Sequence, residues 1–389
     1  MRLIHTADWH LGRILGSKDR TPEIEFALNE LLNQAKTYEV DTVLVAGDIF
    51  DQTNPSIEAE RVAYQFFYGL QAAKIPAIVI AGNHDSATRF DSLANLLSLA
   101  NVHILGKPRL AKEGGVVTLN TANGKLRVGA MPFANERRLL TPDALWNQDE
   151  EQQLQNYQET LTYILSDLAS AFKEDSINIL MAHLTIYGTQ LADSERTFHS
   201  QGIYAISEQS FPSEAQYIAL GHLHRTQSVK MAIPTYYAGS LIQVDFGEAE
   251  EEKGFYLIEV EPGEPAKVEF QSIPCQKPLK EICCDLEDLE EELAENCEHP
   301  GYLKVIVDLQ TPEVGLANRV RKICPQTIFV ESRYPEAIQT ACQSQNGKKL
   351  FNPVEEYRSY YQNRLGSTLS PSVLTKFKEL YKDMQNETH

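Results

Sequence analysis

The chain has 389 residues, of which 42% are hydrophobic and 23% are charged, a composition that is ordinary for a globular protein of one large or two smaller domains. No apolar run reaches the roughly 18 residues that a membrane-spanning helix needs, and the chain does not start with a basic segment and an apolar leader. These features argue against a membrane helix and predict a cytoplasmic protein.

The net charge of −19 is concentrated in one segment. Residues 248–298 hold 17 Asp or Glu and 4 Lys or Arg. We interpret this run as a solvated face. Because phosphate neutralisation dominates DNA binding, the run argues against DNA lying along this segment and leaves DNA binding elsewhere open.

Short apolar strands alternate with amphipathic helices over the first 220 residues. The expected strands cover residues 3–5, 42–46, 77–81, 177–181 and 217–220, and their apolar residues run without alternation, as in strands buried on both faces. The expected helices cover 22–39, 56–73 and 150–172. Hairpins are expected around Asn123-Gly124 and around residues 262–265. This order predicts an α/β sandwich with mixed sheets.

From about Cys275 the pattern changes. A helix over 285–296, a strand over 302–309, a helix over 313–323 and a strand over 327–331 suffice for a small α+β domain. We therefore divide the chain into residues 1–274, 275–345 and 346–389. All six cysteines lie at or beyond Cys275 without a Cys-x-x-Cys pair, which is typical of small buried residues in a reducing compartment.

Two short helices are expected after a polar linker at 343–349. Asn352-Pro353 and Ser370-Pro371 each supply an N-cap followed by a proline at the first helical position. Each helix has one apolar face, but a pair this small buries little by itself. It therefore either packs on its own domain or binds a partner.

Five polar blocks stand at the carboxyl ends of the five expected strands, where ligands bind in open α/β sheets. The blocks are Asp8-x-His10, Gly47-Asp48-x-x-Asp51, Gly82-Asn83-His84-Asp85, Ala182-His183 and Gly221-His222-x-His224. Each block alone is more often structural. Five of them in this order favour one shared site.

Two divalent cations fit this set of side chains, because each cation needs several ligands and an open position. Asp48 can bridge both ions. Three groups would complete one site and three the other: Asp8, His10 and His224, and then Asn83, His183 and His222. Mixed carboxylate and imidazole ligands suit manganese, iron or zinc better than magnesium, and we favour two manganese ions.

His84 is adjacent to Asn83, and neighbouring side chains on a turn point in different directions. We therefore expect His84 to protonate the leaving oxygen or to stabilise the transition-state charge. Asp51 could hold His84 in the required tautomer. Arg13, Lys18, Arg20, Arg89 and Arg225 follow the blocks, and each is more often a structural or solvated charge than a phosphate contact.

The blocks resemble those of the calcineurin-like metallophosphoesterase superfamily. Segments 1–12, 45–51, 81–86 and 217–225 are similar to the SbcD family of nuclease subunits, which act with an SbcC-type ATPase in bacterial DNA repair. The resemblance covers roughly residues 1–275 well. It implies a four-layer α/β/β/α nuclease domain, two manganese ions on the seven ligands, and His84 with Asp51 as the catalytic pair, although relatives can carry His where this chain has Asp51.

The same resemblance implies a capping domain that contacts DNA and a terminal helix–loop–helix that binds the ATPase, in a homodimer within a heterotetramer. Its exonuclease and endonuclease activity would act on DNA ends and hairpins. Two alternatives stay open at this point. One is a small-molecule or cyclic-nucleotide phosphodiesterase of the same superfamily, and the other is a non-catalytic scaffold at DNA ends.

Overall fold

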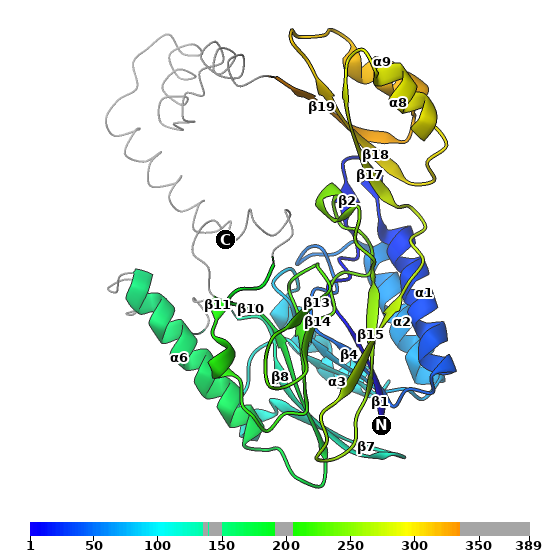
Figure 1. Cartoon of the computed structure of the whole chain (residues 1–389). Coiled ribbons are helices and arrows are strands. Elements are labelled where there is room, and N and C mark those ends of the chain that lie inside the picture. The colour runs from blue at the N-terminus through cyan, green and yellow to red at the C-terminus, as the bar shows by residue number, and fades with distance from the viewer. Residues whose placement is uncertain (135–138, 140–149, 191–204, 335–389) are drawn as a thin grey trace, which may run out of the picture.

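The structure, a computed structural model, describes residues 1–134, 139, 150–190 and 205–334. Two six-stranded sheets stack against each other, and helices cover their outer faces (Figure 1). This is the α/β sandwich with mixed sheets that the sequence predicts, in the four-layer α/β/β/α form that the resemblance implies. Within the described residues, no helix is long and apolar enough to cross a membrane.

The first sheet is mixed. Its strands are β1 (Arg2–Thr6), β4 (Thr42–Val45), β5 (Ala77–Ile80), β6 (Val102–Leu105), β15 (Gly254–Glu259) and β16 (Lys267–Ser272), in the order β16-β15-β1-β4-β5-β6. Strands β1, β4, β5 and β6 run parallel, whereas β15 pairs antiparallel with β1 and with β16. Every residue of β4 and β5 is buried, which explains their unbroken apolar runs.

The second sheet is also mixed. Its strands are β7 (Val116–Thr121), β8 (Gly124–Met131), β9 (Ile177–His183), β12 (Tyr217–Gly221), β13 (Gln227–Val229) and β14 (Thr235–Tyr237), in the order β13-β14-β12-β9-β8-β7. Strands β8, β9, β12 and β14 run parallel, and the outer pairs are antiparallel. The hairpin expected at Asn123-Gly124 joins β7 to β8.

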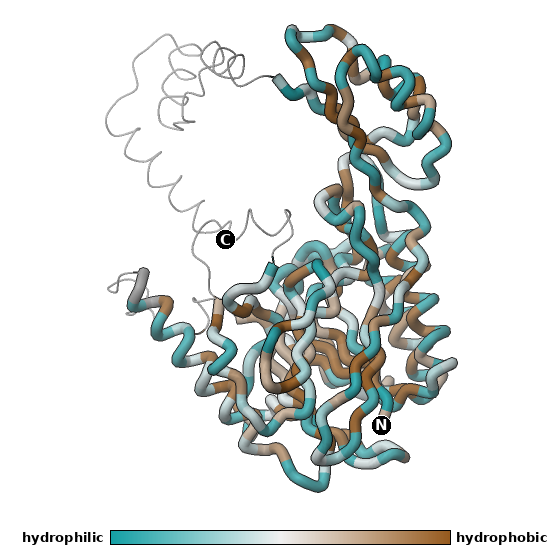
Figure 2. Tube along the Cα trace, viewed as in Figure 1, coloured by the Kyte–Doolittle hydropathy of each residue, from teal (hydrophilic) through white to brown (hydrophobic). Residues whose placement is uncertain are grey.

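Three helices cover the first sheet and one covers the second. They are α1 (Thr21–Thr37), α2 (Ile57–Ala72) and α3 (Ala87–Ser98), and then α6 (Glu150–Ala169). Ser56 caps α2 by accepting a hydrogen bond from the Ala59 N–H, which is worth about 0.5–2 kcal/mol. A third apolar cluster fills the space between the sheets, so the hydrophobic segments of Figure 2 lie at the centre of the domain.

The five expected strands, three helices and two hairpins of this domain are confirmed. The sequence pattern does not predict α3, because only Ala87 and Phe90 of its residues are buried and the apolar stripe is correspondingly short. Shorter elements lie in the connections: β2 (Ile14–Leu15), β3 (Lys18–Asp19), β10 (Thr185–Ile186), β11 (Ala205–Ile206), and the 3-10 turns η1 (Ala111–Glu113), η2 (Glu208–Ser210) and η3 (Phe246–Glu248).

A smaller unit follows the large domain. Strands β17 (Leu279–Asp285), β18 (Tyr302–Asp308) and β19 (Thr327–Arg333) form a parallel sheet, connected through α8 (Leu289–Asn296) and α9 (Leu316–Ile323). Strand β17 is not predicted, because charged residues separate its buried ones. The acidic helix therefore starts at Leu289 and not at Asp285. With β17 as a third parallel strand, this unit has α/β topology where α+β was expected.

A small apolar cluster joins the two units. Leu15 of β2, Phe246 of η3 and Leu279 of β17 are its buried members. The predicted linker and terminal helix pair, residues 343–389, lie outside the described residues.

Candidate metal centre

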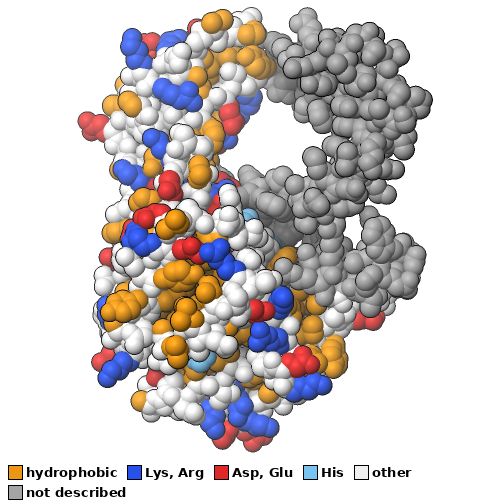
Figure 3. Space-filling view, turned by 180° about the vertical axis from the view of Figure 1, so that it is seen from behind, with side chains coloured by type: hydrophobic (Ala, Val, Ile, Leu, Met, Phe, Trp, Pro, Cys, Tyr) orange, Lys and Arg blue, Asp and Glu red, His pale blue; other side chains and the backbone are white. Residues whose placement is uncertain are grey.

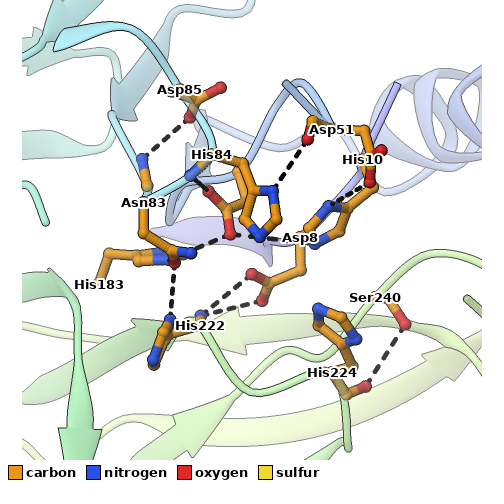
Figure 4. Close-up of polar contacts among 12 residues, drawn as sticks. Asp8, His10, Asp51, Asn83, His84, Asp85, His183, His222, His224 and Ser240 are labelled. Atoms are coloured by element: carbon orange, nitrogen blue, oxygen red, sulfur yellow. Dashed lines mark hydrogen bonds and ion pairs between the residues drawn. The ribbon is translucent and has the colours of Figure 1, made fainter. Parts of the chain in front are cut away.

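The seven candidate ligands converge where loops of the two sheets meet, and six of them are labelled in Figure 4. Strands β1, β4 and β5 of one sheet lead to Asp8, His10, Asp48 and Asn83, and β9 and β12 of the other lead to His183, His222 and His224. Because the carboxyl ends of parallel strands share one edge of a sheet, stacking two such sheets brings both sets of loops together.

The donor atoms form three groups, and the group of His10, Asp48 and His84 shares one residue with each of the other two. Those of Asp8, His10 and His224 lie within 4.8 Å of one another, and so do those of Asp48, His183 and His222. Asn83 Oδ1 lies 3.0 Å from His183 Nε2 and 2.8 Å from His222 Nδ1. Asp48 Oδ2 lies 3.4 Å from His183 Nε2 and 3.9 Å from His10 Nε2. The Asp48 carboxylate is thus close to members of both groups.

The loops that carry these residues are strained. Asp8, His10 and Asp48 have φ angles of 51°, 52° and 52°, and His222 has a φ of 99°. Such left-handed conformations cost of order 1–3 kcal/mol each in non-glycine residues and persist only where the surroundings impose them. Here main-chain hydrogen bonds impose them, from Asp8 N to Gly47 O at 3.0 Å and from His10 N to Asp48 O at 3.1 Å.

Two glycines of the blocks are required because neighbouring side chains lie too close to their Cα atoms for a Cβ to fit. A Cβ on Gly47 would overlap the His183 ring, and a Cβ on Gly82 would overlap the Asp48 carboxylate. Gly47 also has a φ of 98°, which disfavours any side chain. The glycines therefore allow two loops from one sheet and a histidine from the other to pack together.

Burial makes the charges of this cluster depend on one another. It raises the pKa of Asp8 to about 7, with a contribution from Asp48. Burial would also raise the pKa of Asp48, but the neighbouring His183 outweighs it and lowers the pKa. Burial would lower the pKa of His183, but Asp48 and Asp8 raise it to about 9. Without a cation the cluster therefore retains protons that a divalent cation would displace on binding.

The donor set matches a divalent metal site. It contains buried carboxylates, imidazoles and one amide oxygen, the mixture that suits transition-metal ions. Nε2 of the buried His10 has no hydrogen-bond partner among the described residues. The His183 Nδ1 donates to the Ala46 carbonyl at 2.8 Å, which leaves Nε2 on the side of Asn83 and Asp48.

His84 lies beside the cluster and contacts Asp51 through a main-chain atom. The His84 Nδ1 donates to the main-chain carbonyl of Asp51 at 2.9 Å. The Asp51 carboxylate instead lies 3.3 Å from His10 Nδ1 and 3.3 Å from Arg13 Nη1. The loop after β4 presents its main chain to that ring, so Asp51 can hold the tautomer of His84 through its carbonyl.

Asp85 connects the loop after β4 with the loop after β5 by hydrogen bonds. Its carboxylate accepts from the main-chain N–H groups of Ile49, Phe50 and Gly82 at 3.2, 3.0 and 2.9 Å. These bonds hold the loop after β4 against the loop after β5. The sequence pattern places Asp85 in its block but predicts no role for it.

Most of the candidate DNA-contacting cations have structural partners. Arg20 is fully buried and pairs with Glu23, and Arg13 contacts Asp51. Arg89 pairs with Glu60, and Arg225 lies 3.6 Å from Glu251. The acidic segment 248–298 is likewise not wholly solvated, because Glu248 at its start is buried.

Two family models and several known proteins match this chain. Residues 1–226 match a family model described as calcineurin-like phosphoesterase, and residues 275–363 match one described as type 5 capsule protein repressor C-terminal domain. The SbcD subunit of the nuclease SbcCD from Bacillus subtilis (strain 168) is 30% identical over 398 residues, covering 100% of this chain and 99% of that protein.

The SbcD subunits of Escherichia coli (strain K12) and Staphylococcus epidermidis are 30% and 29% identical, each over 75% of this chain and over 73% and 75% of their own lengths. Among solved structures, a dimetal phosphatase from Danio rerio aligns over 70% of this chain and 96% of its own, at 12% identity and a TM-score of 0.41. That score is too low to support an argument.

Proposed function

This chain belongs to the calcineurin-like phosphoesterase family, and we propose that it is a metal-dependent DNA nuclease working under an SbcC-type ATPase. The observation that carries the proposal is the convergence of six donor groups around Asp48, where loops of the two sheets meet. The full-length relation to the SbcD subunit of the nuclease SbcCD supports DNA as the substrate. We propose DNA ends and hairpins, cut by exonuclease and endonuclease activity.

We assign the metal ligands as two groups that share Asp48. Asp8, His10 and His224 would hold one cation, and Asn83, His183 and His222 the other. When bound, such cations stabilise negative charge on a phosphate and lower the pKa of a bound water. Mixed imidazole and carboxylate ligands disfavour magnesium and suit manganese, iron or zinc, and among these we propose manganese.

We assign the catalytic role to His84. Its ring contacts that of His10 at a centroid distance of 4.8 Å, and its main-chain N–H donates to Asp48 Oδ1 at 2.8 Å. The Asp51 carbonyl fixes the proton on Nδ1. The half-buried ring, when both of its nitrogens carry a proton, can therefore donate the Nε2 proton to the leaving oxygen of a phosphodiester. Asp51 contributes its carbonyl to this role.

We propose the same division of the chain as the sequence suggests: a nuclease domain (1–274), a capping domain that contacts DNA (275–345), and a linker with a helix–loop–helix (346–389) that binds the ATPase. The match of residues 275–363 to a separate family model supports a second unit there. A reducing, cytoplasmic setting agrees with the five described cysteines, all of which are free.

We also propose that two copies pair within a heterotetramer. Hydrophobic side chains gather on the rear face of the molecule (Figure 3). On α2 and at the end of α3, Tyr68, Leu96 and Leu99 are 71%, 63% and 81% exposed. Large exposed apolar side chains on adjacent helices are typical of protein interfaces.

The experiment that tests the function uses two substrates. The full chain, with and without the ATPase, is incubated with manganese and either end-labelled hairpin DNA or a chromogenic phosphodiester. We expect cleavage of the DNA, and the His84→Gln variant serves as a folded control without activity. Cleavage of the small ester alone would favour a small-molecule phosphodiesterase, and binding of DNA without cleavage of either substrate would favour a scaffold.

A further inference from the structure

A buried carboxylate stands directly behind His224. Glu248, the last residue of η3, is fully buried although it begins the acidic segment. Its Oε1 lies 3.1 Å from Nδ1 of His224. A carboxylate can only accept, so Nδ1 donates and carries the proton. Nε2 is then the ring nitrogen that can bind a metal.

The second oxygen of Glu248 also has partners. Oε2 accepts from the Val244 N–H at 3.0 Å and lies 2.8 Å from Nζ of Lys253. Lys253 is buried as well, and it donates to the main-chain carbonyl of His224 at 2.9 Å. The buried pair therefore contacts His224 at both its ring and its backbone.

We propose that Glu248 is a positioning residue that fixes the tautomer and orientation of His224 for metal binding. This inference rests on the proposed metal centre and assigns a role that the sequence pattern gives no hint of. Outer carboxylates that hold a ligand histidine typically contribute 10–100-fold to metal affinity.

The turn that carries Glu248 is attached to the smaller unit. The Phe246 ring packs against Phe329 of β19 at a centroid distance of 5.9 Å. Gln243 donates to the Ala249 carbonyl at 2.7 Å and accepts from the Leu279 N–H of β17 at 2.7 Å. These contacts connect the smaller unit to the turn that carries Glu248, and Glu248 connects that turn to His224.

Glu248→Gln tests the tautomer directly. The Val244 N–H and the Lys253 ammonium require an acceptor, so the amide oxygen must take the place of Oε2. The amide NH₂ then faces Nδ1 of His224, which has to become an acceptor. In a neutral ring the proton moves to Nε2, and this nitrogen can no longer bind a metal.

Metal binding is measured by calorimetry with manganese on the full chain. We expect Glu248→Gln to lose about 10–100-fold in affinity at one of two sites and to keep the other. The exposed Glu250→Gln makes the same change of charge two residues away and should bind like the wild type. Two sites of unchanged affinity in Glu248→Gln would overturn the proposal.

A second measurement needs no change at Glu248. The chain is labelled with ¹⁵N-histidine without metal, and the His224 signals are assigned by comparison with His224→Gln. We expect the tautomer protonated at Nδ1, and protonation at Nε2 alone would overturn the proposal even if the Glu248 variant failed to fold. A wild-type chain that bound no manganese would refute the metal centre instead, so the two failures are distinguishable.

Discussion

Arg20 is a buried cation at the junction of the two units. Replacing it tests whether its charge stabilises the fold or contacts DNA. Arg20 is completely inaccessible and donates to both oxygens of Glu23, at 2.8 and 2.6 Å. It also donates to the Gln243 carbonyl at 3.1 Å and lies 5.4 Å from the Tyr302 ring centroid. Arg20→Met removes these contacts and leaves Glu23 buried without its partner, which costs about 3–5 kcal/mol.

The free energy of unfolding is measured by urea titration with a chelator present, so that metal binding cannot compensate. Arg20→Met with Glu23→Leu should regain most of the loss, because a hydrophobic pair of similar volume can replace a buried ion pair. Lys18→Met removes a charge from the exposed end of the same hairpin and should be nearly neutral. If Arg20→Met costs less than about 1 kcal/mol and weakens DNA binding, the residue is a phosphate contact and the reasoning fails.

Four further changes have defined outcomes. His84→Gln should lower the cleavage rate by about 10²–10⁴-fold while calorimetry still finds two metals; loss of a metal would make it a ligand. Asp48→Ala should abolish binding at both sites, and two retained metals would disprove a bridging role. Deletion of 350–389 should preserve manganese phosphodiesterase activity, whereas co-purification with the ATPase should be lost; a truncated chain that still co-purified would contradict the assignment. Leu96→Lys with Leu99→Lys should convert a dimer into a monomer by light scattering; a dimer that persisted would contradict pairing through this face.

Much of the fold could be predicted from the sequence because local patterns report burial on both faces. The unbroken apolar runs of β4 and β5 predict interior strands, and the polar blocks that follow them mark the loops at their carboxyl ends. Since parallel strands end at one edge, the sequence could also place Asp8, Asp48 and Asn83 together. Among the elements it missed, α3 and β17 have weak patterns because few of their residues are buried.

Tertiary structure decided which charges are buried and what they contact. The sequence places Glu248 in an acidic run and Arg20 in a loop, and neither position reveals a fully buried side chain. Their partners come from other segments of the chain, as with His224 behind Glu248. The contact of His84 with a main-chain carbonyl is equally invisible, because every residue has such a carbonyl. The sequence by itself therefore predicted the proposed ligand set, whereas the packing of distant segments determined how those side chains are held.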